Sequence, residues 1–379
     1  MSGTLKILHI MSSHGGGISA FIQNKAEEMP DHHVLFDVAT YSECPPDFHQ
    51  AVEGTGGTIH QLINPKTEGW SAFKESFKQI LNFREYDIIH CHIAGYRSEA
   101  YKKIAERHSQ ADFYIHSHTA VPKKNALQNK IEQWFTRKNS KGVVGCGKKA
   151  ILVTYGSRVE DREMMVIPNS IEVHEFIKTE EEVEEKRAVW RRKFGIEEDE
   201  ILIGHIGRLH PIKNHQFTLA LGQYIQEAGS KAKIIITGAG DLEEELKNQV
   251  KDLNLEQTVQ FSGRISPISD YYPALDALIL PSFNEGLPTV IVEAQAAALP
   301  CLVSDTITSE VDLGFGLVSY LSIEEDPKLW MDTILDLQRA EAPDSRKRRE
   351  KIIEKKFSNQ ASAQLYVDYF RGRIDHYQI

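Results

Sequence analysis

The sequence predicts an α/β protein with two Rossmann-like domains. Apolar runs of four to eight residues alternate with longer amphipathic stretches along almost the whole chain. This alternation is typical of parallel strands whose two faces are covered by helices. The runs fall into two series of similar length, and a chain of 379 residues has the length of two domains rather than one.

The first series predicts an N-terminal domain over residues 1–172. Helical stretches such as 18–29, 72–82 and 98–108 separate its apolar runs. The predicted buried strands of this domain are 5–11, 34–39, 86–89, 113–115, 142–144 and 164–167.

The second series predicts a C-terminal domain over residues 195–354, with helices such as 242–253 and 289–298. An acidic run at 180–185 precedes it, which is typical of a solvated helix face. Residues 355–379 predict an amphipathic helix, which we expect to pack on the N-terminal domain. The predicted strands of the second series are 201–206, 233–236, 259–261, 277–280, 300–303 and 316–320.

Composition excludes several classes of protein. The chain is 41% hydrophobic and 26% charged with a net charge of −10, which argues against a dedicated nucleic-acid binder. Its four cysteines form no C-x-x-C pair, so we expect reduced thiols in a cytoplasmic protein. No apolar run approaches the length that spans a bilayer and no signal peptide is evident, so any membrane contact should be peripheral.

The first predicted strand ends in a glycine-rich turn, Gly15, Gly16 and Gly17, directly before a helix. Such a turn lets the backbone approach a ligand, and the helix N-terminus offers N–H groups to an anion. A ligand-facing loop is therefore favoured over a purely structural turn. The match to a dinucleotide fingerprint is weak, because Asp37 falls inside its strand rather than at the strand end.

Two histidine pairs follow the next predicted strands: His90 and His92, then His116 and His118. The carboxyl ends of parallel strands face the ligand crevice, so these rings could converge there. A metal site is conceivable, but no carboxylate accompanies the pairs and we expect none. His90 and His116 are interpreted as structural, and His118 as a substrate contact.

The second domain carries cations at a strand end. Gly207 and Arg208 end the predicted strand 201–206, and Lys213 follows five residues later. Arginine binds a diphosphate bidentately while lysine acts as a point charge, so the pair could hold one. Gly238 and Gly240 form a second glycine turn after the next strand.

The stretch 281–293 combines a phosphate site with two carboxylates. Pro288 suits the first turn of a helix, so the N–H groups of Gly286 and Leu287 would point at a phosphate. Glu285 and Glu293 stand eight residues apart, and sugar hydroxyls are natural donors to them. In the alternative interpretation Glu285 only offsets the helix dipole and Glu293 lies at the surface.

In this order, the motifs resemble those of GT-B glycosyltransferases, specifically the retaining family 4 that includes bacterial exopolysaccharide and capsule enzymes. The resemblance covers nearly the whole chain and implies two Rossmann-like domains that face a central cleft. The motifs that carry it are Gly15-Gly16-Gly17, Pro168-Asn169-Ser170, Gly207-Arg208-Leu209 with Lys213, Gly238-x-Gly240, Phe261-Ser262-Gly263-Arg264 and Glu285-x7-Glu293.

The resemblance assigns roles to individual residues. Arg208 and Lys213 would hold the donor diphosphate, which Gly16, Gly17, Gly238, Gly286 and Leu287 would also approach. Glu285 would contact the transferred sugar, Glu293 the ribose, and the backbone at Ile265 the base. His118 aligns with the family's histidine near the donor sugar, although His116 stays possible. The implied catalytic residues are His118, Arg208, Lys213 and Glu285.

The resemblance also implies the reaction. A hexosyl group would pass with retention from a nucleotide-diphosphate sugar to a glycan or lipid-linked acceptor in cell-surface polysaccharide synthesis. The chain contains no Asp-x-Asp, the pair with which metal-dependent glycosyltransferases hold a cation, so we expect a metal-independent enzyme without a cofactor. A UDP-sugar is favoured weakly over a GDP-sugar.

A basic region spans residues 122–149, with eight lysines and arginines against Glu132 alone. Leu127, Ile131, Trp134 and Phe135 recur there at helical spacing. A basic amphipathic helix is typical of a membrane-surface element, so we expect contact with anionic lipid at the inner face of the membrane. The alternative is a helix that packs on its own domain with its lysines solvated.

Three other functions stay open. A GT-B-fold NDP-sugar epimerase or phosphorylase would use the same donor site. A non-catalytic sugar-nucleotide-binding subunit would bind without transfer. An NAD enzyme could use the Gly15 turn but would leave Arg208, Lys213 and the two glutamates unexplained.

Overall fold

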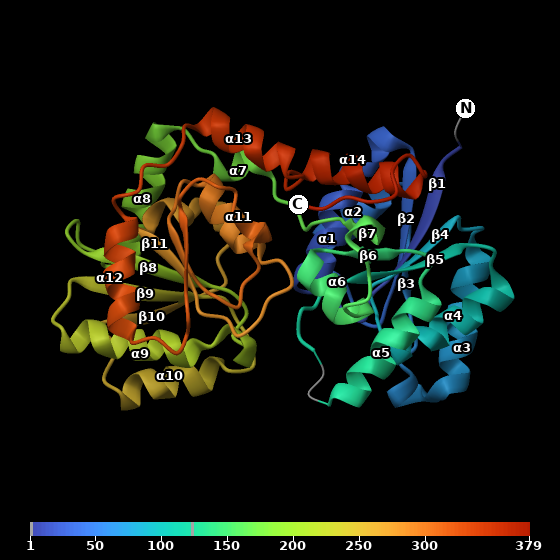
Figure 1. Cartoon of the computed structure of the whole chain (residues 1–379), viewed down its shortest axis with the longest axis horizontal. Helices are drawn as coiled ribbons and strands as arrows, with labels where there is room; N and C mark the ends of the chain where they lie inside the picture. Colours follow the sequence, from blue (N-terminus) through green and yellow to red (C-terminus); the bar gives the residue numbers. More distant parts are fainter. Residues whose placement is uncertain (1–2, 123–124) are drawn as a thin grey trace. The chain divides into compact units, whose positions relative to one another are not determined.

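The computed structural model describes residues 3–122 and 125–379 (Figure 1). The chain divides into two compact units. Unit 1 runs up to Ser170 and resumes at Lys356–Ile379, whereas unit 2 comprises Ile171–Lys355. Within the described ranges, no helix combines the length and the apolar character that crossing a membrane requires.

Unit 1 contains a seven-stranded parallel sheet in the order β3-β2-β1-β4-β5-β6-β7. Six of its strands were predicted from apolar runs, whereas β3 was missed because it is a short, half-exposed edge strand. The strands are β1 (Leu5–Ile10), β2 (Val34–Thr40), β3 (Ile59–Gln61), β4 (Ile88–Cys91), β5 (Asp112–Ser117), β6 (Val143–Gly145) and β7 (Met164–Val166).

Helices cover both faces of this sheet. One face packs against Phe21, Phe48 and Tyr366 from three helices, and the other against Phe73 and Tyr155. Both cores are fully buried, as expected for a doubly covered parallel sheet. The helices of unit 1 are α1 (Gly17–Ala26), α2 (Pro46–Gly54), α3 (Pro65–Phe83), α4 (Tyr96–His108), α5 (Ala126–Asn139), α6 (Lys148–Tyr155) and α14 (Asn359–Phe370).

The C-terminal helix α14 belongs to unit 1, where it lies beside α1 (Figure 1). Ser362 Oγ donates to the carbonyl oxygen of Pro168 at 3.0 Å, and Tyr377 forms a parallel bridge with Met165. The last segment of the chain therefore completes the core of the unit with which the chain begins.

Unit 2 contains a six-stranded parallel sheet in the order β10-β9-β8-β11-β12-β13. Its strands are β8 (Ile201–Ile206), β9 (Ala232–Thr237), β10 (Val259–Gly263), β11 (Ala277–Leu280), β12 (Cys301–Ser304) and β13 (Val318–Leu321). Its helices are α7 (Val173–Phe176), α8 (Glu180–Phe194), α9 (His215–Glu227), α10 (Glu243–Asp252), α11 (Thr289–Ala296), α12 (Pro327–Leu337) and α13 (Ser345–Glu354).

Helix α8 is part of unit 2, so this unit begins before the predicted boundary at residue 195. Arg187 and Arg191 on α8 form ion pairs of 2.6 and 2.9 Å with Asp276, just before β11. The acidic first turn of α8 is exposed, and a capping box of Thr179 and Glu182 begins the helix. The acidic run is thus a solvated helix face.

Candidate active site

Four neighbouring strands of unit 2 direct predicted site residues to one edge of the sheet. Arg208 follows β8, Gly238 follows β9, Ile265 follows β10 and Glu285 follows β11. In parallel sheets this carboxyl edge is where ligands bind. The sheet order therefore brings together residues that lie far apart in the sequence.

Lys213 and Glu285 form the central contact of this edge. Lys213 Nζ lies 2.8 Å from Glu285 Oε1, and the two side chains are only 14% and 16% exposed. The predicted diphosphate cation and the predicted sugar carboxylate are thus a largely desolvated ion pair. Glu285 fixes the ammonium group, which retains further N–H donors for an anionic ligand.

Glycines allow the turns after β8 and β9 to touch. A Cβ on Gly238, at φ +142°, would lie 1.9 Å from the carbonyl oxygen of Gly207, and a Cβ on Gly240 would lie 2.3 Å from that of Leu209. Leu209 N donates to the carbonyl oxygen of Ala239 at 3.1 Å. The second glycine turn therefore supports the backbone that carries Arg208 and Lys213.

Arg208 is the exposed cation of the site. Its guanidinium lies 3.6 Å from Asp241, and the two side chains are 66% and 84% exposed. An exposed pair at this distance contributes little free energy. Arg208 can therefore exchange Asp241 for a more highly charged anion, such as a diphosphate, with little loss of free energy.

Glu293 is half-buried and hydrogen-bonded, so it is not the freely exposed surface glutamate of the alternative interpretation. Its Oε2 accepts a hydrogen bond of 2.6 Å from Tyr272, and burial raises the pKa of its carboxyl group. Helix α11 begins at Thr289, so Pro288 is the N-cap residue rather than part of the first turn. Gly286 and Leu287 lie just before this helix terminus.

The glycine turn of unit 1 has a backbone conformation with positive φ, which favours glycine over other residues. Gly15 and Gly16 have φ values of +104° and +91°, and Gly16 is the N-cap residue of α1 without a side-chain cap. A Cβ on Gly17 would lie 3.1 Å from Asn169 Nδ2. Asp37, by contrast, lies inside β2 and binds Arg84 and Tyr86, so it has a structural role.

The histidines form one hydrogen-bonded cluster, in which the Tyr366 hydroxyl group links His90 to His9. His92 Nδ1 lies 2.8 Å from His118 Nε2, and His92 Nε2 lies 3.0 Å from Nδ1 of His9. His116 and His90 are joined at 3.2 Å. Burial lowers the pKa of all five rings, that of His9 and of His118 to about 3, so the cluster is uncharged at neutral pH.

Neutral imidazoles are the form that metals bind, and ring nitrogens of His92, His116 and His118 lie within 4.8 Å of one another. These residues could therefore hold a transition metal, and the absence of a metal site stays a prediction. His118 Nδ1 and His116 Nε2 are both buried and have no hydrogen-bond partner among the described residues. The structure thus leaves a free ring nitrogen on each candidate for the substrate-contacting histidine.

Residues 186–356 match the family model described as Glycosyl transferases group 1. This segment is a group 1 glycosyltransferase domain. It begins within α8 and contains every predicted donor-site residue of unit 2.

Sequence similarity to proteins named as glycosyltransferases extends beyond this segment. The Bacillus subtilis (strain 168) protein EpsF, named as a glycosyltransferase, is 29% identical over 342 residues, or 88% of each chain. The Escherichia coli UDP-Gal:alpha-D-GlcNAc-diphosphoundecaprenol alpha-1,3-galactosyltransferase is 31% identical over 150 residues, or 39% of this chain and 38% of that one.

A solved structure shows the same fold. Anabaena HepE in complex with UDP-glucose superposes with a TM-score of 0.76 at 16% identity, over 98% of this chain and 100% of that one. The predicted GT-B fold with two Rossmann-like domains is confirmed.

The basic region of the glycosyltransferase contains α5. Leu127, Ile131 and Trp134 lie on one side of this helix and are 68%, 46% and 52% exposed, whereas Thr136 and Asn139 are buried. These three apolar side chains therefore point to solvent, whereas Phe135, the fourth of the predicted set, is half-buried. Lys123 and Lys124 of the predicted region lie outside the described residues.

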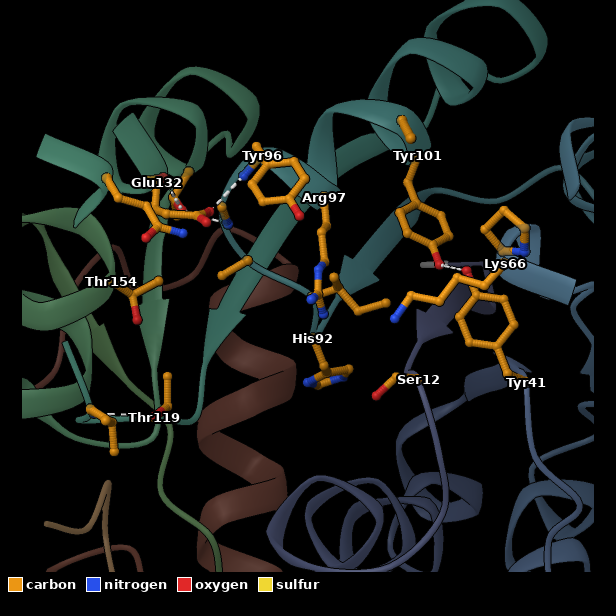
Figure 2. A pocket seen from close by; sticks show the side chains of 18 of the residues that line it. Ser12, Tyr41, Lys66, His92, Tyr96, Arg97, Tyr101, Thr119, Glu132 and Thr154 are labelled. Atoms are coloured by element: carbon orange, nitrogen blue, oxygen red, sulfur yellow. Dashed lines mark hydrogen bonds between the residues drawn. The ribbon is translucent and has the colours of Figure 1, made fainter. Parts of the chain in front are cut away.

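A cavity of about 850 Å³ opens within unit 1 beside this helix (Figure 2). Its lining includes Ser12 after β1, His92 after β4 and Thr119 after β5, together with Lys66 and Arg97 from the first turns of α3 and α4. The cavity was not predicted from the sequence, because Lys66 and Arg97 lie on separate helices and form no recognisable sequence motif.

Proposed function

We propose that this glycosyltransferase is a retaining, metal-independent family 4 enzyme that transfers a hexosyl group from a nucleotide-diphosphate sugar. The observation that carries the proposal is the strand-end arrangement of Lys213, Glu285 and Arg208 in unit 2. Cleavage of the donor places negative charge on the departing diphosphate. Fixed cations and helix N–H groups stabilise that charge best when they are already oriented.

Each residue would then have a defined task. Lys213, held by Glu285, and the exposed Arg208 would bind the diphosphate, while Glu285 would also accept a hydrogen bond from a hydroxyl of the transferred sugar. The carboxylate of Glu293 would accept hydrogen bonds from the ribose hydroxyl groups in place of its hydrogen bond from Tyr272. His118 would contact the donor sugar, and the departing phosphate would help to deprotonate the acceptor hydroxyl.

A UDP-sugar is the favoured donor. Support comes from HepE, which was solved with UDP-glucose, and from the E. coli relative, whose name specifies UDP-Gal. Thermal shifts against UDP-, GDP- and ADP-sugars test this choice, because a ligand at 100 times its Kd adds about 2.7 kcal/mol to the unfolding free energy. A flat response across the panel would argue against the donor site, whereas a shift without any transfer would favour the non-catalytic sugar-nucleotide-binding subunit.

The acceptor is proposed to be a glycan or a lipid-linked glycan received by unit 1, in the synthesis of a cell-surface polysaccharide. The E. coli relative supports this class, because its name specifies a diphosphoundecaprenol-linked acceptor. Product analysis by NMR would show the same anomeric configuration as in the donor. Turnover that needs no acceptor and only changes the donor sugar would indicate an epimerase instead.

The exposed face of α5 is proposed to bind anionic lipid at the cytoplasmic side of the membrane. Lys130 and Arg137 are exposed on the helix that presents Leu127 and Trp134, so charge and apolar area favour the same surface. Vesicles with and without anionic lipid test the proposal. Leu127→Ser with Trp134→Ser should abolish binding, whereas Val189→Ser, on an exposed helical site of unit 2, should not.

Metal independence is tested by activity after chelation. EDTA should leave turnover unchanged. A loss that Mn²⁺ or Mg²⁺ restores would contradict this part of the proposal.

A further inference from the structure

The cavity in unit 1 is built around two cations. Figure 2 shows the side chains of Lys66 and Arg97 reaching into the same space, above His92 and Ser12. Lys66 comes from the first turn of α3 and Arg97 from that of α4. Among the described residues, neither side chain lies within ion-pair distance of a carboxylate.

The one carboxylate among the lining residues, Glu132, is already engaged. It accepts a hydrogen bond of 2.8 Å from the backbone N–H of Tyr96, at the N-terminus of α4. A Cβ on Gly95 would lie 1.7 Å from Glu132 Oε2, so the glycine makes room for this contact. The helix terminus therefore holds Glu132, which among the described residues forms no ion pair with Lys66 or Arg97.

The other polar groups of the cavity add no negative charge. The hydroxyl groups of Tyr41 and Tyr101 are hydrogen-bonded to each other, and burial raises the pKa of both. Burial lowers the pKa of His92, which keeps its ring neutral. The two positive side chains of the cavity therefore lie near side chains that are uncharged at neutral pH.

Two aromatic side chains stand beside the cations. Trp70 and Tyr96 line the cavity and are 57% and 53% exposed. Exposed aromatic faces next to polar groups are typical of binding sites, and such faces can stack on a sugar ring. The volume of about 850 Å³ is in the range of small-molecule sites.

We propose that this cavity binds an anionic group on the acceptor glycan, with Lys66 and Arg97 holding a carboxylate or phosphate while Trp70 and Tyr96 contact the sugar ring. The inference rests on the proposed function, since it names the acceptor of that reaction. A uronic acid and a sugar phosphate offer the same chemistry to the two cations.

Binding without a donor tests this proposal separately from transfer. Calorimetry or saturation-transfer NMR would compare methyl glucuronide, glucose 1-phosphate and neutral methyl glucoside. The neutral probe cannot form the charge-assisted hydrogen bonds, so at least one anionic probe should bind roughly tenfold or more tightly than the neutral one. Preference for glucuronide would identify a uronic acid, and preference for the phosphate a phosphorylated acceptor.

Variants locate the site. Lys66→Gln and Arg97→Gln should each weaken the anionic probe about tenfold and leave methyl glucoside unchanged. Lys74→Gln and Arg107→Gln, exposed on the same two helices, are matched controls.

Equal binding of charged and neutral probes, or unchanged binding in both cavity variants, would overturn the inference. A failure of the proposed function is distinguishable, because it would appear as absent donor binding or transfer while the anionic probe still binds.

Discussion

Replacement of Lys213 separates its structural role from its role in the reaction. The ion pair with Glu285 has a 2.8 Å contact, and both side chains are more than four-fifths buried. Breaking an exposed pair costs about 0–1 kcal/mol and breaking a fully buried pair about 3–5 kcal/mol. We therefore expect Lys213→Met to lose about 2 kcal/mol, or roughly 4–8 °C in the melting of unit 2.

The double variant Lys213→Met with Glu285→Gln should recover most of this stability, because no buried charge is left unpaired. Its turnover should nevertheless stay about 100-fold or more below that of the native protein, as in the single variant. Thermal melting and initial rates of nucleotide release measure the two effects. Lys231→Met, which breaks the exposed pair with Asp199, is the control and should change neither by much.

Near-native turnover in the double variant would contradict a role of Lys213 in the reaction, because Lys213 would then matter only as a partner of Glu285. Melting of Lys213→Met at the native temperature would show that the pair contributes nothing to the fold.

Further predictions concern Glu293, Gly238 and two buried histidines. Because burial raises the pKa of Glu293, its ionisation opposes folding above about pH 4.5, so Glu293→Gln should gain stability over the native protein between pH 4.5 and 8. Denaturant titrations at the two pH values check this, and an equal difference at both would contradict it. Gly238→Ala should lose at least ~1–3 kcal/mol and weaken donor binding, whereas Gly229→Ala, whose Cβ meets nothing within 4 Å, should bind donor normally. The pKa of His9 and of His118 is lowered to about 3, so the unfolding free energy should fall as the pH drops from 6.5 towards 3, by up to ~1.4 kcal/mol per pH unit for each ring. A pH-independent stability across that interval would show that these rings are protonated in the folded state.

The sequence predicted the elements whose signal is local. Buried parallel strands are continuous apolar runs, which is why β1 and β8 were found with nearly correct ends. Strand β3 has only three half-buried or exposed residues, so its pairing with β2 and not its composition makes it a strand. The assignment of α8 to unit 2 depends on Arg187 and Arg191 meeting Asp276, a contact between distant residues.

For the candidate site too, the local pattern predicted which residues take part, but not which residues they contact. Arg208, Lys213 and Glu285 were singled out by their place at strand ends, but their contacts follow from the order of the strands in the sheet. His9 was missed as a site residue because it lies within an otherwise largely apolar strand, although it is joined to His92. The conformation of each side chain in such a cluster depends on packing that no spacing rule contains.

The most direct test of the account is the steady-state release of nucleoside diphosphate by the native protein and by Arg208→Ala. The donor is the nucleotide sugar that gives the largest thermal shift. We expect turnover by the native protein and a loss of about 100-fold or more in Arg208→Ala. Arg192 is an exposed arginine of unit 2, and Arg192→Ala should leave turnover unchanged. Near-native turnover in Arg208→Ala would contradict the assignment of the donor site to the strand ends of unit 2.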